Sequence, residues 1–396
     1  MSDYVVVEEG LARLKVPNPS LYRDERGRFE PAWAPVFFNP RMRLSRDVGS
    51  VLVKAYALYS GRSRLRVLDA LAATGARGIR YAVENREYVG SVVLNDLSPL
   101  AARIAEENVR LNGLEGVAQV RNMDASRLML EEGGFDIVEI DPFGTPAPFV
   151  DPALRVVSHN GMLCVTATDM PPLLGHYPYT SLRKYFSWSL RTEFSRETGA
   201  RILLYFTARE AAKLGKRVYP LYTQSSDHYI RVCVKVENRE AEAGGLKGSV
   251  GYVEYCPRGL HRRMAVGVVP RLRERCPVCG VKLLYAGPLW VGSLWDRDFA
   301  VLVARIYREE LGRRRLSRRG EKVTRLIASE VDAPPLYYTT DSLASKYGLA
   351  REPSAAKLVE RLSESGFPAS LTHFDSKGFR SSLPPEKLAS VARAMG

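Results

Sequence analysis

The chain has 396 residues, with 58 lysines and arginines against 44 aspartates and glutamates and a formal net charge of +14. This length exceeds what one hydrophobic core usually serves, so it predicts two domains or one large domain with additions. The charge favours a polyanionic partner, although charge alone does not separate RNA from DNA or anionic lipid. The sequence lacks a signal-peptide pattern and any apolar run near the roughly 20 residues of a membrane helix, which predicts a cytoplasmic protein with no membrane partner.

In chain order, the first predicted elements are a hairpin over residues 4–16 and a proline-rich, aromatic stretch over residues 17–40. From Leu65 onward, strand-like runs alternate with helix-like stretches such as 99–111 and 181–198. The predicted strands have the sequences RVLDAL, SVVLNDL, AQVRNMDA, FDIVEIDP, GMLCVTATD, ARILLYFTAR and HYIRVCVKVE. This alternation indicates a doubly wound, seven-stranded Rossmann-like α/β sheet, in which ligands bind beyond the carboxyl ends of the strands.

The first three strand ends carry features typical of a nucleoside cofactor site. The turn DALAATGARG, from Asp69 to Gly78, has glycines that permit close backbone approach of a cofactor; an ordinary tight connection is the alternative. Asp96 ends the second strand, where a carboxylate can accept hydrogen bonds from both ribose hydroxyls, as it also does in NAD enzymes. Asp124 and Ala125 follow the third strand and offer a carboxylate and a backbone amide to an adenine edge; helix capping is the alternative for Asp124.

The fourth strand ends in the loop Asp141-Pro142-Phe143-Gly144, which supplies what methylation of an aromatic amine requires. Such a nitrogen is a poor nucleophile because its lone pair is delocalised into the ring, so a catalyst should accept hydrogen bonds from its N–H groups. The Asp141 carboxylate and the Pro142 carbonyl suit this role, and Phe143 offers a stacking face for a base lifted out of its helix. A structural Asx-Pro turn is the alternative.

Several further stretches, spread over nearly the whole chain, are more specific together than any one motif. They are FFNPRMRLSRD, LDALAATGARGIR, LNDLSP, NMDASRLM, IDPFGTP, VTATDMPPL, LRKYF, DHYIRVCVKV and GPLWVGSLWD. With them the sequence resembles an archaeal member of the tRNA (guanine-26, N2)-dimethyltransferase family. The resemblance implies a class I methyltransferase domain that dimethylates N2 of guanosine 26 in tRNA with S-adenosylmethionine, and a smaller basic α+β C-terminal domain.

The resemblance also implies roles for individual residues. Asp141 would be the catalytic carboxylate, flanked by Pro142, and Phe143 would help to hold the target guanine. The implied S-adenosylmethionine contacts are Arg46, Arg77, Asp96, Asp124 and Ala125. An arginine can bind the cofactor's carboxylate by charge-assisted hydrogen bonds, and a phosphate or surface contact is the alternative for Arg46. The implied partner is tRNA, and no obligate protein partner is expected.

Metal binding is a separate question that centres on three cysteines. Cys276 and Cys279 form a C-P-V-C-G knuckle typical of a zinc ribbon. The second knuckle is incomplete: Cys256 is followed by Gly259 where many relatives carry the fourth cysteine, which leaves His261 as the candidate fourth ligand. Three cysteines and one histidine could form a tetrahedral Zn²⁺ site, and a degenerate remnant without metal is the alternative.

The five cysteines are irregularly spaced and do not resemble a secreted disulfide framework. Cys164 and Cys233 lie in apolar predicted strands. We interpret these two as core residues.

A domain boundary is predicted between residues 235 and 251, at a polar, glycine-containing linker. It divides the chain into a methyltransferase domain over residues 1–240 and a tRNA-binding domain over residues 241–396. Residues 340–382 of the second domain predict a helix-turn-helix with a wing, which could grip an RNA backbone or support the catalytic half.

Clustered arginines interrupt a helix predicted from Phe299. They lie at 313–315 and 318–319, a placement consistent with phosphate contacts. Charge runs are more often solvated faces, so both interpretations stay open.

Three rival functions fit parts of the sequence. A methyltransferase acting on amines in DNA or another RNA would use similar motifs, but the whole-chain resemblance argues against it. A nicotinamide-dependent oxidoreductase explains the first two motifs and leaves Asp141-Pro142-Phe143 unexplained. A non-enzymatic RNA-binding protein would not need residues for both the cofactor and the amine.

Overall fold

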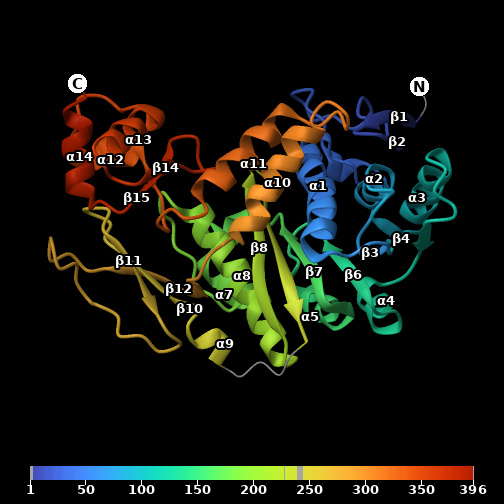
Figure 1. Cartoon of the computed structure of the whole chain (residues 1–396), viewed down its shortest axis with the longest axis horizontal. Coiled ribbons are helices and arrows are strands. Elements are labelled where there is room, and N and C mark those ends of the chain that lie inside the picture. The colour runs from blue at the N-terminus through green and yellow to red at the C-terminus, as the bar shows by residue number, and fades with distance from the viewer. Residues whose placement is uncertain (1–2, 227, 239–243, 396) are drawn as a thin grey trace.

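The computed structural model describes residues 3–226, 228–238 and 244–395 (Figure 1). It opens with the predicted hairpin, whose strands are β1 (Tyr4–Glu9) and β2 (Ala12–Pro17). Two 3-10 turns, Pro31–Trp33 and Pro40–Met42, lie in the proline-rich stretch that leads to α1 (Arg43–Ser60). Strand β2 packs against helices of the following domain, so the N-terminal segment lies beside the central sheet.

The central sheet has seven strands in the order β5-β4-β3-β6-β7-β9-β8, which confirms the predicted doubly wound fold. The strands from β3 to β7 pair in parallel, whereas β9 is antiparallel to both of its neighbours. Their bounds are β3 Leu65–Asp69, β4 Val89–Asn95, β5 Ala118–Arg121, β6 Phe135–Ile140, β7 Val157–Ala167, β8 Arg217–Ser226 and β9 Tyr229–Glu237. The strand order reverses between β3 and β6, and that crevice is where such sheets bind ligands.

Helices cover the sheet because its inner strands are apolar on both faces. The neighbouring residues Val67 and Leu68 point to opposite faces of β3, and both have no exposed surface. The covering helices are α2 Ala76–Glu84, α3 Pro99–Leu111, α4 Ala125–Glu131, α5 Ala147–Val156, α6 Met170–Leu173, α7 Pro178–Tyr185 and α8 Ser195–Lys213.

The prediction of a strand at ARILLYFTAR was wrong, because residues 200–209 lie inside α8. This helix packs between β8 and β12, so nearly all of its sides are buried and its apolar residues show no helical period. The amphipathic helix predicted over 181–198 is also divided, since α7 ends at Tyr185 and α8 begins at Ser195. The sixth strand is β8, which follows α8.

Cys164 and Cys233 are core residues as predicted, with no exposed surface, but they are also joined by a disulfide that the sequence interpretation did not include. The two residues face each other directly across the antiparallel pair of β7 and β9. Their sequence separation is 69 residues. Only the insertion of β9 beside β7 brings them together.

The C-terminal part begins with α9 (Gly244–Lys247) and a three-stranded sheet in the order β11-β10-β12. Its strands are β10 Val250–Tyr255, β11 Arg262–Val266 and β12 Leu284–Trp290. Two helices, α10 (Arg297–Glu310) and α11 (Arg318–Glu330), then pack against α1 across the front of Figure 1. The predicted linker falls partly on residues 239–243, which lie outside the described residues.

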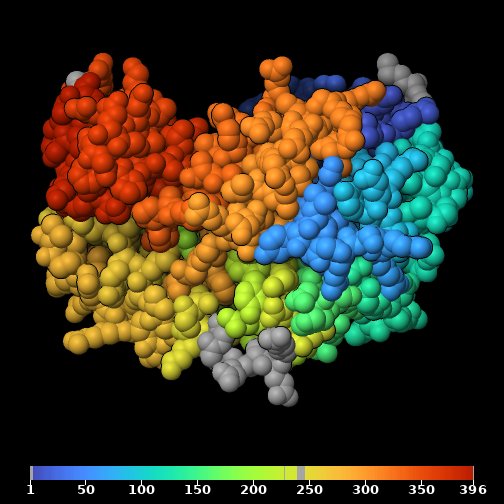
Figure 2. Space-filling model, viewed as in Figure 1, coloured from blue at the N-terminus to red at the C-terminus, as the bar shows by residue number. Residues whose placement is uncertain are grey.

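The predicted helix-turn-helix with a wing is present at the end of the chain. Its elements are β13 Tyr338–Thr339, α12 Thr340–Tyr347, α13 Ala355–Glu364, β14 Ala369–Leu371, β15 Gly378–Ser381 and α14 Pro385–Arg393. They enclose a small apolar core of their own. This terminal unit (338–395) lies directly on the 250–290 region in the space-filling view (Figure 2).

The arginine-rich segment does not continue a helix from Phe299, since α10 ends at Glu310. Arg314 is buried and donates to Ser50 Oγ at 3.2 Å and Asn85 Oδ1 at 3.1 Å, so it holds the segment to α1 and to the end of α2 instead of facing solvent. Arg318 and Arg319 lie exposed in the first turn of α11. Within the described ranges, no helix is both long and apolar enough to cross a membrane.

Candidate active site

A cavity of about 550 Å³ opens at the crevice between β3 and β6. Its walls come from the proline-rich segment, from the turn after β3, from the loop after β6 and from residues 168–170 after β7. Gly75 enters α2 with φ +77°, a left-handed conformation that suits glycine. Gly78, in the first turn of α2, packs so close to β4 that a Cβ would lie 2.3 Å from Leu94 Cδ2, so a side chain there would force Leu94 to move.

The Asp141-Pro142-Phe143-Gly144 loop lines the cavity and is held by Thr168. The Gly144 N–H donates to Thr168 Oγ1 at 2.7 Å, and the Thr168 N–H donates back to the Gly144 carbonyl at 2.9 Å. The Thr168 hydroxyl also lies 3.4 Å from the Pro142 carbonyl. These bonds make the loop a rigid platform.

Phe143 is 77 % exposed, and its ring meets that of Phe37 edge to face with centroids 5.6 Å apart. Both rings line the cavity. The pair provides an aromatic wall that a planar base can contact. Sequence reasoning identified Phe143 and missed Phe37, which comes from the irregular stretch before α1.

Arg77 holds Asp141 in place. The Arg77 guanidinium pairs with the Asp141 carboxylate and donates to Ser45 Oγ at 3.0 Å. Arg77 is only 6 % exposed, so this charge-assisted contact is shielded from water. A second buried pair lies deeper, where Glu139 binds Arg231 at 2.6 Å. The carboxylate therefore has a defined orientation toward the cavity.

Asp69, at the end of β3, also lines the cavity and accepts a hydrogen bond from the Gly78 N–H at 3.0 Å. Burial, together with the nearby charges of Glu139 and Asp141, raises its pKa to about 7 despite the opposing charge of Arg77. The protonated form is thus the one that the fold favours at mildly acidic pH.

This raised pKa predicts a pH-dependent stability. Between the unfolded pKa of about 4 and the folded pKa of about 7, the folded state holds a proton that the unfolded state has lost, so the free energy of unfolding should fall as pH rises. Asp69→Asn should remove that slope while keeping an oxygen for the Gly78 N–H. Urea unfolding of both proteins across this range measures it, and equal slopes would contradict the prediction.

Arg46 faces the cavity from α1 and forms a two-point contact with Glu9, both distances being 2.6 Å. Its guanidinium also lies 4.9 Å from the centre of the Phe38 ring. Burial acts to raise the pKa of Glu9, but the charges of Arg46 and Arg80 outweigh it and lower that pKa to about 2. Sequence reasoning did not identify Glu9, because its partners lie far along the chain.

The other predicted cofactor contacts are Asp96, Asp124 and Ala125. All three are described by the structure, and none of them lines the cavity. Asp96 is next to it, since its Oδ2 accepts from the N–H of the lining residue Ala73 at 2.8 Å. Asp124 caps α4 by accepting from the Arg127 N–H at 2.9 Å, which is the capping role weighed against cofactor binding. Ala125 is buried in the first turn of that helix. Their contact with a cofactor stays a prediction.

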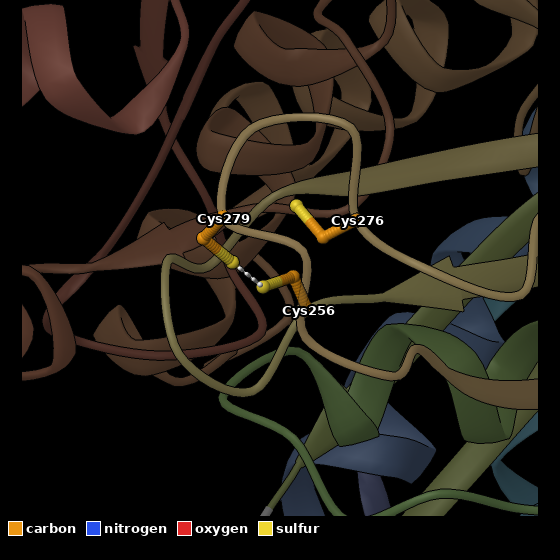
Figure 3. A group of neighbouring side chains, drawn as sticks. All are labelled: Cys256, Cys276 and Cys279. Atoms are coloured by element: carbon orange, nitrogen blue, oxygen red, sulfur yellow. Dashed lines mark hydrogen bonds between the residues drawn. The ribbon is translucent and has the colours of Figure 1, made fainter.

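The residues present fit a cofactor that joins a nucleoside to an amino acid. Two buried arginines, Arg46 and Arg77, line the cavity beside their partners Glu9 and Asp141 and can add a contact to a carboxylate. Ala72 and Ala73, in the turn after β3, line it too. The volume lies in the range of small-molecule sites. The predicted metal ligands are elsewhere, in the turns flanking β10–β12, where the sulfurs of Cys256, Cys276 and Cys279 lie within 4.8 Å of one another (Figure 3).

Comparison with known proteins identifies the family of this chain. A family model described as N2,N2-dimethylguanosine tRNA methyltransferase matches residues 12–393. A tRNA (guanine(26)-N(2))-dimethyltransferase from Saccharolobus solfataricus is 35% identical over 390 residues, covering 98% of this chain and 98% of the relative. A tRNA (guanine(26)-N(2)/guanine(27)-N(2))-dimethyltransferase from Aquifex aeolicus is 33% identical over 388 residues, covering 97% and 94%.

A solved structure is similar over the same length. That of Trm1 from Pyrococcus horikoshii with S-adenosyl-L-methionine has a TM-score of 0.82 and 31% identity, and the match covers 98% of this chain and 99% of that one. The order of strands, the loop after β6 and these matches lead to one conclusion: the chain belongs to the N2,N2-dimethylguanosine tRNA methyltransferase family.

Proposed function

We propose that this chain transfers methyl groups from S-adenosylmethionine to the exocyclic N2 amine of guanosine 26 in tRNA, giving N2,N2-dimethylguanosine. The family match and the names of the relatives support this reaction. The observation that carries it is the Asp141-Pro142 loop, whose two residues line a cavity of the size of a small-molecule site. The Aquifex relative, named for positions 26 and 27, makes the neighbouring guanosine a second candidate site.

Asp141 and Pro142 would activate the amine. The carboxylate and the Pro142 carbonyl accept hydrogen bonds from the two N2 hydrogens, which localises the nitrogen lone pair toward the methyl donor. Asp141 then takes the proton that leaves as positive charge develops on nitrogen. Phe143 and Phe37 contact the base once it leaves its stack, at an energetic cost of a few kcal/mol for unstacking.

When bound, S-adenosylmethionine supplies an electrophilic methyl group for direct transfer. We assign its contacts to Arg46, Arg77, Asp96, Asp124 and Ala125, with the two arginines facing its carboxylate. Arg77 also touches Asp141, so one residue links the cofactor pocket to the amine pocket. Transfer needs no covalent bond to the protein. A second round follows if the monomethylated amine rotates its remaining hydrogen toward Asp141.

The C-terminal part would hold the rest of the tRNA. Residues 241–396 carry 26 lysines and arginines against 16 acidic residues, whereas residues 1–240 carry 32 against 28. Such an excess of positive charge strengthens binding to the phosphates of an RNA backbone. The division into these two domains remains our prediction, and the largest apolar core extends across it. We also propose that the protein acts in the cytoplasm and needs no obligate protein partner.

Labelled methyl transfer to unmodified tRNA transcripts tests the function. We expect dimethylguanosine from a transcript with guanosine at position 26 and none from one with adenosine there, as read by nucleoside analysis. Transcripts that vary position 27 show whether that guanosine is also modified. Transfer to DNA or to an unrelated RNA at the same rate, or no transfer to tRNA, would contradict the proposal.

Thr168→Val should lower kcat by roughly 10- to 100-fold, because the loop loses the hydroxyl contacts that position the Pro142 carbonyl while its volume stays nearly the same. The KM for S-adenosylmethionine should change little, since Thr168 does not hold the arginines. Thr168→Ser keeps the hydroxyl and should retain most of the rate. A valine variant with the wild-type kcat would show that the loop needs no such support.

A further inference from the structure

A chain of buried polar side chains connects the interior of the central sheet to Asp141. Glu139 in β6 and Arg231 in β9 are almost completely buried, and Tyr81 of α2 has no exposed surface. All three are described by the structure, and none of them lines the cavity. Any part that they play in the reaction must therefore act through other residues.

Glu139 Oε1 is the shared acceptor of this group. It accepts from the Tyr81 hydroxyl at 2.7 Å and from Arg231 Nη2 at 2.6 Å. Arg231 Nη1 donates in turn to Thr166 Oγ1 at 3.0 Å, and Thr166 lies directly opposite Arg231 on the neighbouring strand β7. The Glu139 carboxylate is thus fixed from two sides.

The Tyr81 hydroxyl connects Glu139 to Arg77. The hydroxyl has one proton and donates it to Glu139, so toward Arg77 its oxygen can only accept. Arg77 Nη1 donates to that oxygen at 3.4 Å and to the Ser45 carbonyl at 3.5 Å. Arg77 Nη2 pairs with the Asp141 carboxylate. Tyr81 therefore holds the guanidinium nitrogen that does not bind Asp141.

The proton of Tyr81 stays on its oxygen at neutral pH. Burial and the charge of Glu139 raise the pKa of Tyr81, and they outweigh the opposing charges of Arg77 and Arg231. The direction of each hydrogen bond between Glu139 and Asp141 is then set. Tyr81 donates to Glu139, and Arg77 donates both to Tyr81 and to Asp141.

Charged groups at this depth are costly to the fold. Charges lose their hydration on burial, and replacing a buried ion pair with apolar side chains of similar volume is often neutral or stabilising. The residues on either side of Glu139 and Arg231 show the apolar alternative, since Val138, Ile140, Ile230 and Val232 have no exposed surface. Buried, perturbed ionisable groups cluster at functional sites. Their position beside the Asp141 loop favours a role in the reaction.

We propose that Tyr81 and Glu139 are positioning residues for methyl transfer. Glu139 orients the Tyr81 hydroxyl, Tyr81 holds Arg77, and Arg77 keeps the Asp141 carboxylate directed at the amine. Without the hydroxyl, the guanidinium is free to rotate and to carry Asp141 with it, and a displacement of about 1 Å is enough to slow a reaction severely. This inference rests on the proposed function, because the reaction that it serves takes place at Asp141.

A double-mutant cycle with Asp141 tests the coupling. Tyr81→Phe should lower the single-turnover rate of methyl transfer by about 10- to 100-fold and leave the affinity for tRNA unchanged. In an Asp141→Asn background the same change should lower the rate by less than about 2-fold, because a group that acts through a carboxylate has no effect once it is gone. Glu139→Gln should show the same dependence on Asp141.

Tyr56→Phe is the matched control. The Tyr56 hydroxyl, in α1, donates to the Asn160 carbonyl at 2.5 Å, and Tyr56 is buried like Tyr81 without lining the cavity. Its loss should lower the melting temperature about as much as Tyr81→Phe does, but the rate should stay at the wild-type value. Equal rate losses in Tyr56→Phe and Tyr81→Phe would reduce the role of Tyr81 to folding and overturn the proposal.

A crystal structure of Tyr81→Phe without tRNA gives a result that does not depend on activity. The Arg77 guanidinium and the Asp141 carboxylate should be displaced relative to a wild-type crystal structure, whereas in Tyr56→Phe they should not move. Unchanged positions in Tyr81→Phe would overturn the proposal, as would a rate loss of the same size with and without the Asp141 carboxylate. Wild type that transfers no methyl group to tRNA would refute the proposed function instead, and the crystal structures would still decide whether Tyr81 positions Asp141.

Discussion

Asp141→Asn is expected to lower kcat for methyl transfer by about 10²- to 10⁴-fold, the usual contribution of a positioned proton acceptor. Asparagine keeps the size of the side chain and one oxygen for Arg77, but it cannot take the proton that leaves the amine. The negative charge that stabilises the developing positive charge on N2 is also lost. Single-turnover methyl transfer to tRNA measures the chemical step directly.

Controls separate this effect from misfolding or lost cofactor. Calorimetric titration with S-adenosylmethionine should give nearly wild-type affinity for Asp141→Asn, since Arg46 keeps its contact with Glu9. Asp151→Asn, which changes a carboxylate on α5 paired with Arg155, should transfer methyl groups at the wild-type rate. If Asp141→Asn turned over like wild type, the proton acceptor would have to be another group.

The second large effect is a loss of folding stability when the buried Arg380 is replaced. Arg380 in β15 is 1 % exposed and binds Glu197 of α8 at 2.8 Å and Glu330 of α11 at 2.6 Å. Arg380→Met should lower the free energy of unfolding by about 3–5 kcal/mol, because it leaves buried carboxylates without their shared cation. Urea unfolding followed by fluorescence measures the loss, and limited proteolysis should release the terminal unit earlier.

Lys377→Ala is the matched control for this change, since Lys377 is half-exposed near the start of the same strand and pairs with Glu352 at the surface. Exposed pairs contribute little, so no measurable loss is expected. Arg380→Lys keeps the charge but not the forked geometry and should fall between wild type and methionine. Wild-type stability of Arg380→Met would mean that the terminal unit is held by apolar packing alone.

Local patterns predicted much of the fold. The helix over 99–111 has those bounds in the structure, because a serine cap, a proline at its first position and apolar spacing all act within the segment. The wing at the end of the chain was predicted for similar reasons. Helix α8 was missed because it is buried on nearly every side, and an apolar run without a period does not separate a helix from a strand.

Local sequence patterns did not predict contacts between side chains that lie far apart in the sequence. Cys164 and Cys233 form a disulfide because β9 enters the sheet antiparallel to β7, and nothing near either cysteine encodes that. Arg314 belongs to a cluster that the sequence left open between phosphate contacts and a solvated face, yet it is buried against α1. In each case the partner of the side chain is set by the packing of elements far apart in sequence.

The sequence by itself determined the family, the α/β class and the loop Asp141-Pro142-Phe143, because turn chemistry and short motifs act within a few residues. Tertiary structure alone decided which groups meet around that loop. It brings Thr168 beneath the Pro142 carbonyl, Glu9 to Arg46, and the His261 ring into the space beside Gly259. Such contacts depend on how strands, helices and the N-terminal hairpin pack in space, and a polar partner is specified only once both sides are buried together.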